Sequence, residues 1–171
     1  RRINIIGNIT TQDEVLRREI RQMEGGWYSS SAISLSKRRL KRLAFVENVV
    51  FEEVRVPGSA NKIDLNVRIQ EKLSGNFNIG AGLGGSGTGL SLSAGLEQDN
   101  FLGFGSKVSL NVDTGKTTRN YSFNFFNPYH NLDSVSRSFG FNVQTQKTDN
   151  TDTVADYEAD RIGLNYSYGI P

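Results

Sequence analysis

The sequence predicts an α+β domain with the element order β-α-α-β-β, followed by the antiparallel strands of an incomplete transmembrane β-barrel. Two observations predict this division. Residues 1–72 carry 14 Lys and Arg against 9 Asp and Glu, with 4 of the 18 glycines, whereas residues 73–171 carry 6 against 9, with 14 glycines. At the same point, mixed helical and strand patterns give way to a persistent period of two. We therefore expect one domain over residues 1–73 and a second over residues 74–171.

The first domain is predicted to contain two helices. Thr11 and Glu14 form a capping-box pattern, which predicts the start of a helix. The apolar residues that follow recur on one face and lead to a Gly-Gly pair that would end the helix: Leu16, Ile20 and Met23. A serine run at residues 29–31 predicts the cap of a second helix.

Three strands complete this domain, over residues 3–6, 45–56 and 63–69. A sheet this small leaves at least one strand edge open. Such an edge either accepts an extended peptide by β-augmentation or is capped by charged side chains, and the residues favour neither reading. The basic run at residues 37–42 has no interleaved aromatic residues, so we expect a solvated helix face and no nucleic-acid partner.

The second domain begins with a glycine-rich strand at residues 75–83. One face of this strand is apolar, with Phe77, Ile79, Ala81 and Leu83. Gly75 begins the strand, and the other face is small or polar, with Asn76, Asn78, Gly80 and Gly82. A strand so poor in side chains pairs through its backbone but is expected to hold its register weakly. With the alternating segments that follow, it predicts about six strands of about ten residues, which is the length a tilted strand needs to cross a bilayer.

Two architectures fit this alternation. In a soluble β-sandwich the apolar face would pack on another sheet, and in a membrane barrel it would face lipid while the polar face lines a wet interior. The uniform Ser, Asn and Gly of the polar face favour the barrel. Because outer-membrane barrels have at least about eight strands, and the chain begins and ends in strand-like sequence, we expect a fragment of a longer protein.

The residues give no sign of catalytic chemistry. The chain has no cysteine and a single histidine, His130, which lies beside aromatic residues in a predicted turn and is expected to be an interfacial loop residue. No nucleophile–base pair, metal-ligand spacing or phosphate loop stands out. We therefore expect a protein that is not an enzyme and that binds no cofactor or metal.

Four segments carry a resemblance to a known family. Residues 15–27, Val-Leu-Arg-Arg-Glu-Ile-Arg-Gln-Met-Glu-Gly-Gly-Trp, resemble the first helix and turn of the membrane-proximal POTRA domain of the BamA family. Residues 55–59 resemble the second hairpin of that domain, and residues 98–103 and 127–129 resemble motifs of the BamA barrel. The resemblance covers essentially the whole chain. Ala44 and His130 depart from the family pattern without affecting the assignment.

The resemblance implies a function and partners. Members of this family fold and insert β-barrel proteins into the outer membrane of Gram-negative bacteria, without nucleotide hydrolysis. The POTRA unit lies in the periplasm, and it binds a BamD-like lipoprotein alongside other subunits of the assembly machine. In the family this contact uses the end of the first helix, which corresponds here to Arg17, Arg21 and Glu24. The alternative for these three residues is an ordinary i,i+3 and i,i+4 charge network on a helix face.

The glycine-rich strand matches the first barrel strand of the family, which forms one side of a lateral gate. Unfolded β-barrel substrates would then pair with its edge, at residues 75–83, within outer-membrane lipid. Two alternatives remain open. One is a transporter of the same superfamily, of the two-partner secretion or the translocation-and-assembly type, and the other is a passive porin or adhesin fragment.

Overall fold

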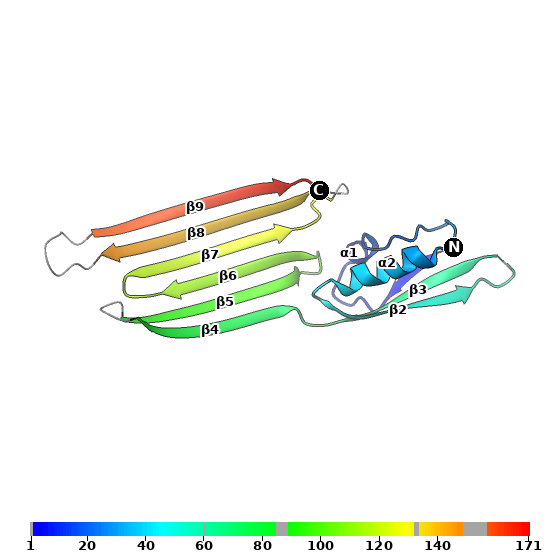
Figure 1. Cartoon of the computed structure of the whole chain (residues 1–171), viewed down its shortest axis with the longest axis horizontal. Helices are drawn as coiled ribbons and strands as arrows, with labels where there is room; N and C mark the ends of the chain where they lie inside the picture. Colours follow the sequence, from blue (N-terminus) through cyan, green and yellow to red (C-terminus); the bar gives the residue numbers. More distant parts are fainter. Residues whose placement is uncertain (1, 60, 85–88, 132–133, 149–156) are drawn as a thin grey trace. The chain divides into compact units, whose positions relative to one another are not determined.

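The computed structural model describes residues 2–59, 61–84, 89–131, 134–148 and 157–171. It divides into two compact units, Arg1–Ser74 with Leu102–Gly105 and Gly75–Phe101 with Ser106–Pro171. The first unit contains β1 (Ile3–Ile6), α1 (Asp13–Arg17), α2 (Ser30–Lys41), β2 (Val46–Arg55) and β3 (Ile63–Glu71). The second contains β4 (Gly75–Gly84), β5 (Gly89–Phe101), β6 (Ser106–Thr114), β7 (Thr118–Asn127), β8 (Ser136–Thr148) and β9 (Tyr157–Gly169) (Figure 1). This order confirms the predicted β-α-α-β-β fold followed by six antiparallel strands.

The first unit is a three-stranded sheet with the order β1-β3-β2. β3 lies in the centre, parallel to β1 and antiparallel to β2. Its buried side chains Leu65, Val67 and Ile69 alternate with exposed or half-buried polar residues, so one face of β3 enters the core. Both helices contribute to that core, with Val15 and Leu16 from α1 and Leu40 from α2. β1 and β2 are the two edge strands of this sheet.

α2 begins where the serine run predicts. The Ser29 hydroxyl accepts a hydrogen bond from the Ala32 N–H at 3.3 Å, which satisfies one of the backbone donors that a helix start leaves unpaired. Leu40 is fully buried near the other end of the helix. Among the described residues, no helix is long and apolar enough to cross a membrane.

α1 is shorter than predicted, because it ends at Arg17 instead of continuing to the Gly-Gly pair. Tertiary contacts explain the difference. The N–H of Arg21, which would extend the helix, donates instead to the buried Ser36 hydroxyl of α2 at 2.8 Å. The predicted capping box is also wrong: the cap position is Gln12, without a side-chain cap. The Thr11 N–H donates to Glu71 at the end of β3, at 2.8 Å.

The second unit is a meander in which each strand pairs with the next, in the order β4-β5-β6-β7-β8-β9. All five pairings are antiparallel. β4 pairs with β5 over its whole length, from Gly75 opposite Gln98 to Gly84 opposite Gly89, without a bulge. Figure 1 shows the six strands side by side in chain order.

The two faces of this sheet have opposite characters. Registered positions form apolar rows that run across all six strands, and one of them contains Phe77, Leu96, Leu110, Phe123, Phe141 and Leu164. The adjacent row on the other face contains Asn78, Gly95, Asn111, Ser122, Asn142 and Gly163. The apolar face stays uncovered, since Phe77 is 67% and Leu164 is 72% exposed. An uncovered face of this kind suits contact with lipid.

Candidate strand-pairing edge and partner-docking surface

The first candidate site is the outer edge of β4. In the sheet order, β4 has β5 on one side and no described strand on the other. In an antiparallel ladder, alternate residues point their N–H and C=O groups toward opposite sides of the strand. Every second residue of β4 therefore directs its backbone groups at the open edge, where another strand can accept and donate hydrogen bonds.

The side chains of this edge strand lie where the sequence predicts. Phe77, Ile79 and Leu83 share the apolar face, and Ile79 and Leu83 are 73% and 86% exposed. On the polar face, side chains of β5 cover the glycines of β4: the Ser91 hydroxyl donates to the Gly82 carbonyl oxygen at 3.2 Å. The inner side of β4 is thus occupied along its length, and no strand among the described residues occupies its outer side.

The second candidate site contains Arg17, Arg21 and Glu24. They do not share a helix end as expected, because only Arg17 belongs to α1. Arg17 forms ion pairs with Asp13 at 2.8 Å and with Glu24 at 3.1 Å. The hydrogen bond with Asp13 is the main cause that raises the pKa of Arg17 above its usual value, so this guanidinium stays charged. Arg17 thus has an i,i+4 partner in Asp13, which was not among the three predicted residues, and Arg21 takes part in no ion pair among the described residues.

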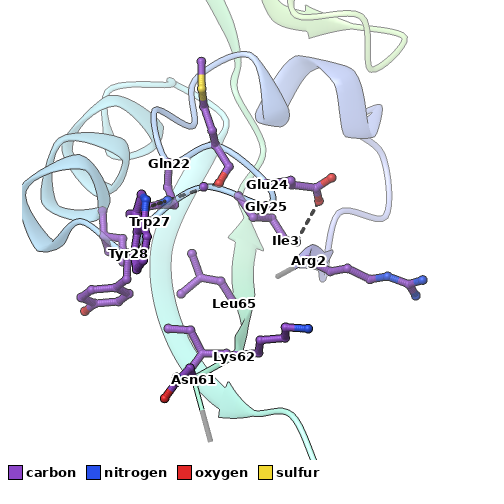
Figure 2. A pocket seen from close by; sticks show the side chains of 14 residues that line it. Arg2, Ile3, Gln22, Glu24, Gly25, Trp27, Tyr28, Asn61, Lys62 and Leu65 are labelled. Carbon is purple, nitrogen blue, oxygen red and sulfur yellow. Dashed lines mark hydrogen bonds between the residues drawn. The ribbon is translucent and has the colours of Figure 1, made fainter. Parts of the chain in front are cut away.

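Glu24 has a structural role as well. Its carboxylate accepts a hydrogen bond from the Ile3 N–H at 2.8 Å, which fixes the start of β1 against the turn that contains Glu24 (Figure 2). Arg21 differs from Arg17 and Glu24 in its contacts. Its side chain is exposed, and it forms no ion pair with the described residues. The three residues thus combine two charges fixed by internal contacts with one cation that is accessible to a partner.

Glu24 also lines a pocket of about 490 Å³ in the first unit. Figure 2 shows Trp27 and Tyr28 on one side of this pocket and Leu65 and Lys62 below it. Trp27, the single tryptophan, is 96% exposed. An exposed indole beside a hollow is typical of the aromatic residues that dominate protein interfaces.

The turn that presents Trp27 is held in place by polar contacts. The side-chain amide of Gln22 donates to the Trp27 carbonyl oxygen at 2.9 Å and accepts from the Ser29 N–H at 2.9 Å. Gly25 has a φ of +74°, which a residue with a side chain rarely adopts. The Tyr28 hydroxyl donates to Glu53, and this hydrogen bond raises the pKa of Tyr28. The indole is therefore displayed on a fixed backbone.

Glu71 connects the end of β3 to the segment before α1. Its carboxylate accepts hydrogen bonds from the N–H groups of Thr10 at 2.9 Å and Thr11 at 2.8 Å. Partial burial raises the pKa of Glu71, but the hydrogen bonds from the Thr11 side chain and the backbone outweigh it, so the pKa is lowered overall. Sequence reasoning missed this contact, because its partners are about 60 residues apart in the chain.

The Glu71 contact predicts a pH dependence. A carboxylate whose pKa is lower in the folded state stabilises that state above its unfolded pKa of about 4.3, and the contribution disappears as the pH falls through the folded pKa. We expect the amides of Thr10 and Thr11 to be better protected from hydrogen exchange in the wild type than in Glu71→Gln at pH 7. The difference should shrink below pH 4.5. A difference that stays constant down to pH 3 would contradict this assignment.

Known families match both units. Residues 1–72 match the POTRA family, described as a surface antigen variable number repeat, and residues 100–171 match the Omp85 superfamily domain. The outer membrane protein assembly factor BamA of Neisseria meningitidis serogroup B is 37% identical over 172 residues, which cover 99% of this chain and 21% of that protein. The chain belongs to the BamA family. BamA of Buchnera aphidicola is 34% identical, over 81% of this chain and 23% of that protein.

Solved structures agree with this family. The crystal structure of BamA from Haemophilus ducreyi lacking POTRA domains 1–3 matches with a TM-score of 0.84 at 37% identity, over 98% of this chain and 31% of that chain. CdiB from Acinetobacter baumannii shares the fold alone, with a TM-score of 0.61 at 17% identity, over 96% of this chain and 32% of that chain. The chain spans about a fifth of the length of the curated BamA relatives. As in that family, the strands of the second unit belong to the outer membrane and the POTRA unit to the periplasm.

Proposed function

We propose that the full-length protein folds and inserts other β-barrel proteins into the outer membrane, and that β4 is the strand on which a substrate strand is paired. The observation that carries this proposal is the open edge of β4, ten residues long, with β5 on its inner side and an uncovered apolar face. The relatives named as outer membrane protein assembly factors support the same role.

The physical argument concerns unpaired backbone groups in hydrocarbon. Each unsatisfied N–H or C=O in a bilayer costs several kcal/mol. An incoming strand that pairs with β4 satisfies its own groups and those of β4 together. An open edge can therefore act as a template that lowers the barrier to strand formation in the membrane, with no nucleotide hydrolysis.

An assay in lipid vesicles tests this function. Full-length protein in vesicles, given a urea-denatured β-barrel substrate, is expected to raise the rate at which the substrate becomes folded in the bilayer. Vesicles with a porin of equal mass serve as the control. Substrate that enters the vesicle interior, protected from protease, would favour a secretion transporter. A rate equal to that of the porin control would overturn the proposal.

We further infer that the surface containing Arg17, Arg21 and Glu24 binds a BamD-like lipoprotein. The support is the accessible charge of Arg21, together with the exposed Trp27 on the same fixed turn. Charged and aromatic groups on a preorganised segment give a partner both orientation and buried apolar area.

A further inference from the structure

On the polar face of the β4–β9 sheet, glycines are covered by polar side chains from the neighbouring strands. Gly95 on the inner strand β5 lies beneath polar side chains from both neighbouring strands: a Cβ added to it would lie 2.9 Å from Asn111 Oδ1 and closer still to Asn78 Oδ1. Gly140 on β8 is covered in the same way, by Asn124 and Asn165. Both glycines are buried, although the sheet is a single layer. We call the space above such a glycine a seat, because the missing side chain leaves room for polar side chains from the two neighbouring strands.

The glycines of the edge strand β4 are covered from one side only. A Cβ added to Gly80 would lie 2.6 Å from the Ser93 hydroxyl, and one added to Gly82 would lie 2.9 Å from the Ser91 hydroxyl. Among the described residues, these two serines of β5 supply every atom within 4 Å of those positions. No described residue therefore covers the outer half of each seat, which lies on the side of β4 that pairs with no described strand.

We propose that the strand that pairs with the open edge of β4 is selected by two polar side chains of Ser or Asn size, two residues apart, that lie over Gly80 and Gly82. This inference rests on the proposed function, because it takes the occupant to be a strand of a β-barrel substrate. Backbone pairing supplies attraction for any extended chain, and side-chain seats supply register and selectivity. The expected pattern is polar–apolar–polar, with the apolar residue opposite Ala81 on the lipid-facing side.

β5 already shows this pattern on the inner side of the same strand. Ser91, Leu92 and Ser93 lie opposite Gly82, Ala81 and Gly80. The seats also resist slippage by one residue, and by two residues in the direction of Asn78. A slip by one residue would turn every side chain to the wrong face, and a slip by two toward Asn78 would set a polar side chain against a residue that has its own Cβ and amide. The glycines of β4 thus help to set the register and the side-chain pattern of the strand that pairs with them.

A double-mutant cycle tests the seats. In the full-length protein in membranes, Ile79→Cys is combined with single cysteines placed along the substrate, and an added thiol oxidant joins the two thiols in a disulfide. The substrate positions that form this adduct identify the residues that lie opposite β4. Gly80→Ala then fills one seat with a single methyl group, and the substrate residue opposite it is changed from Ser or Asn to Gly. Ala81→Val, which adds bulk on the other face of the same strand, is the matched control.

The expected result is coupling between the two changes. Gly80→Ala should lower the yield of the adduct about threefold with the original substrate, a size typical of one cross-strand pair, and should have no effect with the glycine substrate. Gly80→Ala also brings a methyl group against the Ser93 hydroxyl of β5. Repeating the cycle in a Ser93→Ala background removes that contact, and the coupling with the substrate residue should persist.

Two outcomes overturn the inference in different ways. If Gly80→Ala lowers the adduct yield equally with both substrates, the seats do not select side chains. The adduct itself would still show that β4 is the pairing strand. Absence of any adduct between β4 and the substrate would remove the proposed function and the inference together.

Discussion

Replacing both Gly80 and Gly82 with valine is expected to slow substrate assembly by about tenfold or more. Valine favours strand structure over glycine by up to about 1 kcal/mol, and 1.4 kcal/mol is a factor of ten. The added side chains would stiffen β4 in its pairing with β5 and fill both seats on its outer edge. Their first contacts would be the Ser93 and Ser91 hydroxyls, which lie at the ends of side chains that can rotate, so the β4–β5 pairing should survive.

The measurement is the initial rate of substrate folding in vesicles. Ser109→Val and Ser122→Val place the same side chain on the polar face of the inner strands β6 and β7, and they should leave the rate near that of the wild type. If the Gly80→Val/Gly82→Val variant assembles substrate at the wild-type rate, the flexibility of β4 and its seats have no part in the reaction.

Reversing the charge of Arg21 is expected to weaken lipoprotein binding at least tenfold without affecting the fold. Arg21→Glu replaces an exposed cation that forms no ion pair with the described residues, so the stability of the first unit should not change. Removing one partner of a desolvated charge pair in a protein interface costs about 2 kcal/mol or more, because the other charge is left buried and unpaired. Affinity measured by titration calorimetry, with thermal unfolding alongside, separates binding from folding.

Glu24 and α2 supply the comparison variants. Glu24→Gln keeps an oxygen that accepts from the Ile3 N–H but removes the charge, so weaker binding with an intact fold would assign the carboxylate to the interface. Arg38→Glu makes the same charge reversal on the exposed face of α2 and should bind normally. Unchanged affinity in both Arg21→Glu and Glu24→Gln would place the lipoprotein elsewhere.

The second unit was predictable from sequence because its information is local. Each strand alternates apolar and polar residues on its own, and the predicted strand at residues 75–83 became β4 with one residue added. The first helix was not predictable in the same way. Its pattern continues to Met23, yet the buried hydroxyl of Ser36 takes the Arg21 N–H and ends the helix early. The Ser36 hydroxyl comes from another helix, so the local sequence pattern around α1 gives no sign of this hydrogen bond.

The same difference between local pattern and tertiary contact separates the two candidate sites. Phe77 and Ile79 could be assigned to one face of an edge strand from period alone. The pocket beside Trp27 could not, because it joins β1, β3 and the turn at residues 22–28, which are far apart in the chain. Trp27 after a Gly-Gly pair was visible as a motif, but its exposure follows from how Gln22 and Glu24 hold the turn.

The claim that β4 templates substrate strands is tested most directly by a photo-crosslinking residue at Ile79 of the full-length protein in membranes, supplied with an unfolded β-barrel substrate. Ile79 is 73% exposed on β4, which pairs with a described strand on one side only. Val112, in the same row on the inner strand β6, is the control position. We predict cross-links from Ile79 to a strand of the substrate and none from Val112. Cross-links from Ile79 only to the last strand of the protein itself, while the substrate still assembles, would contradict this account.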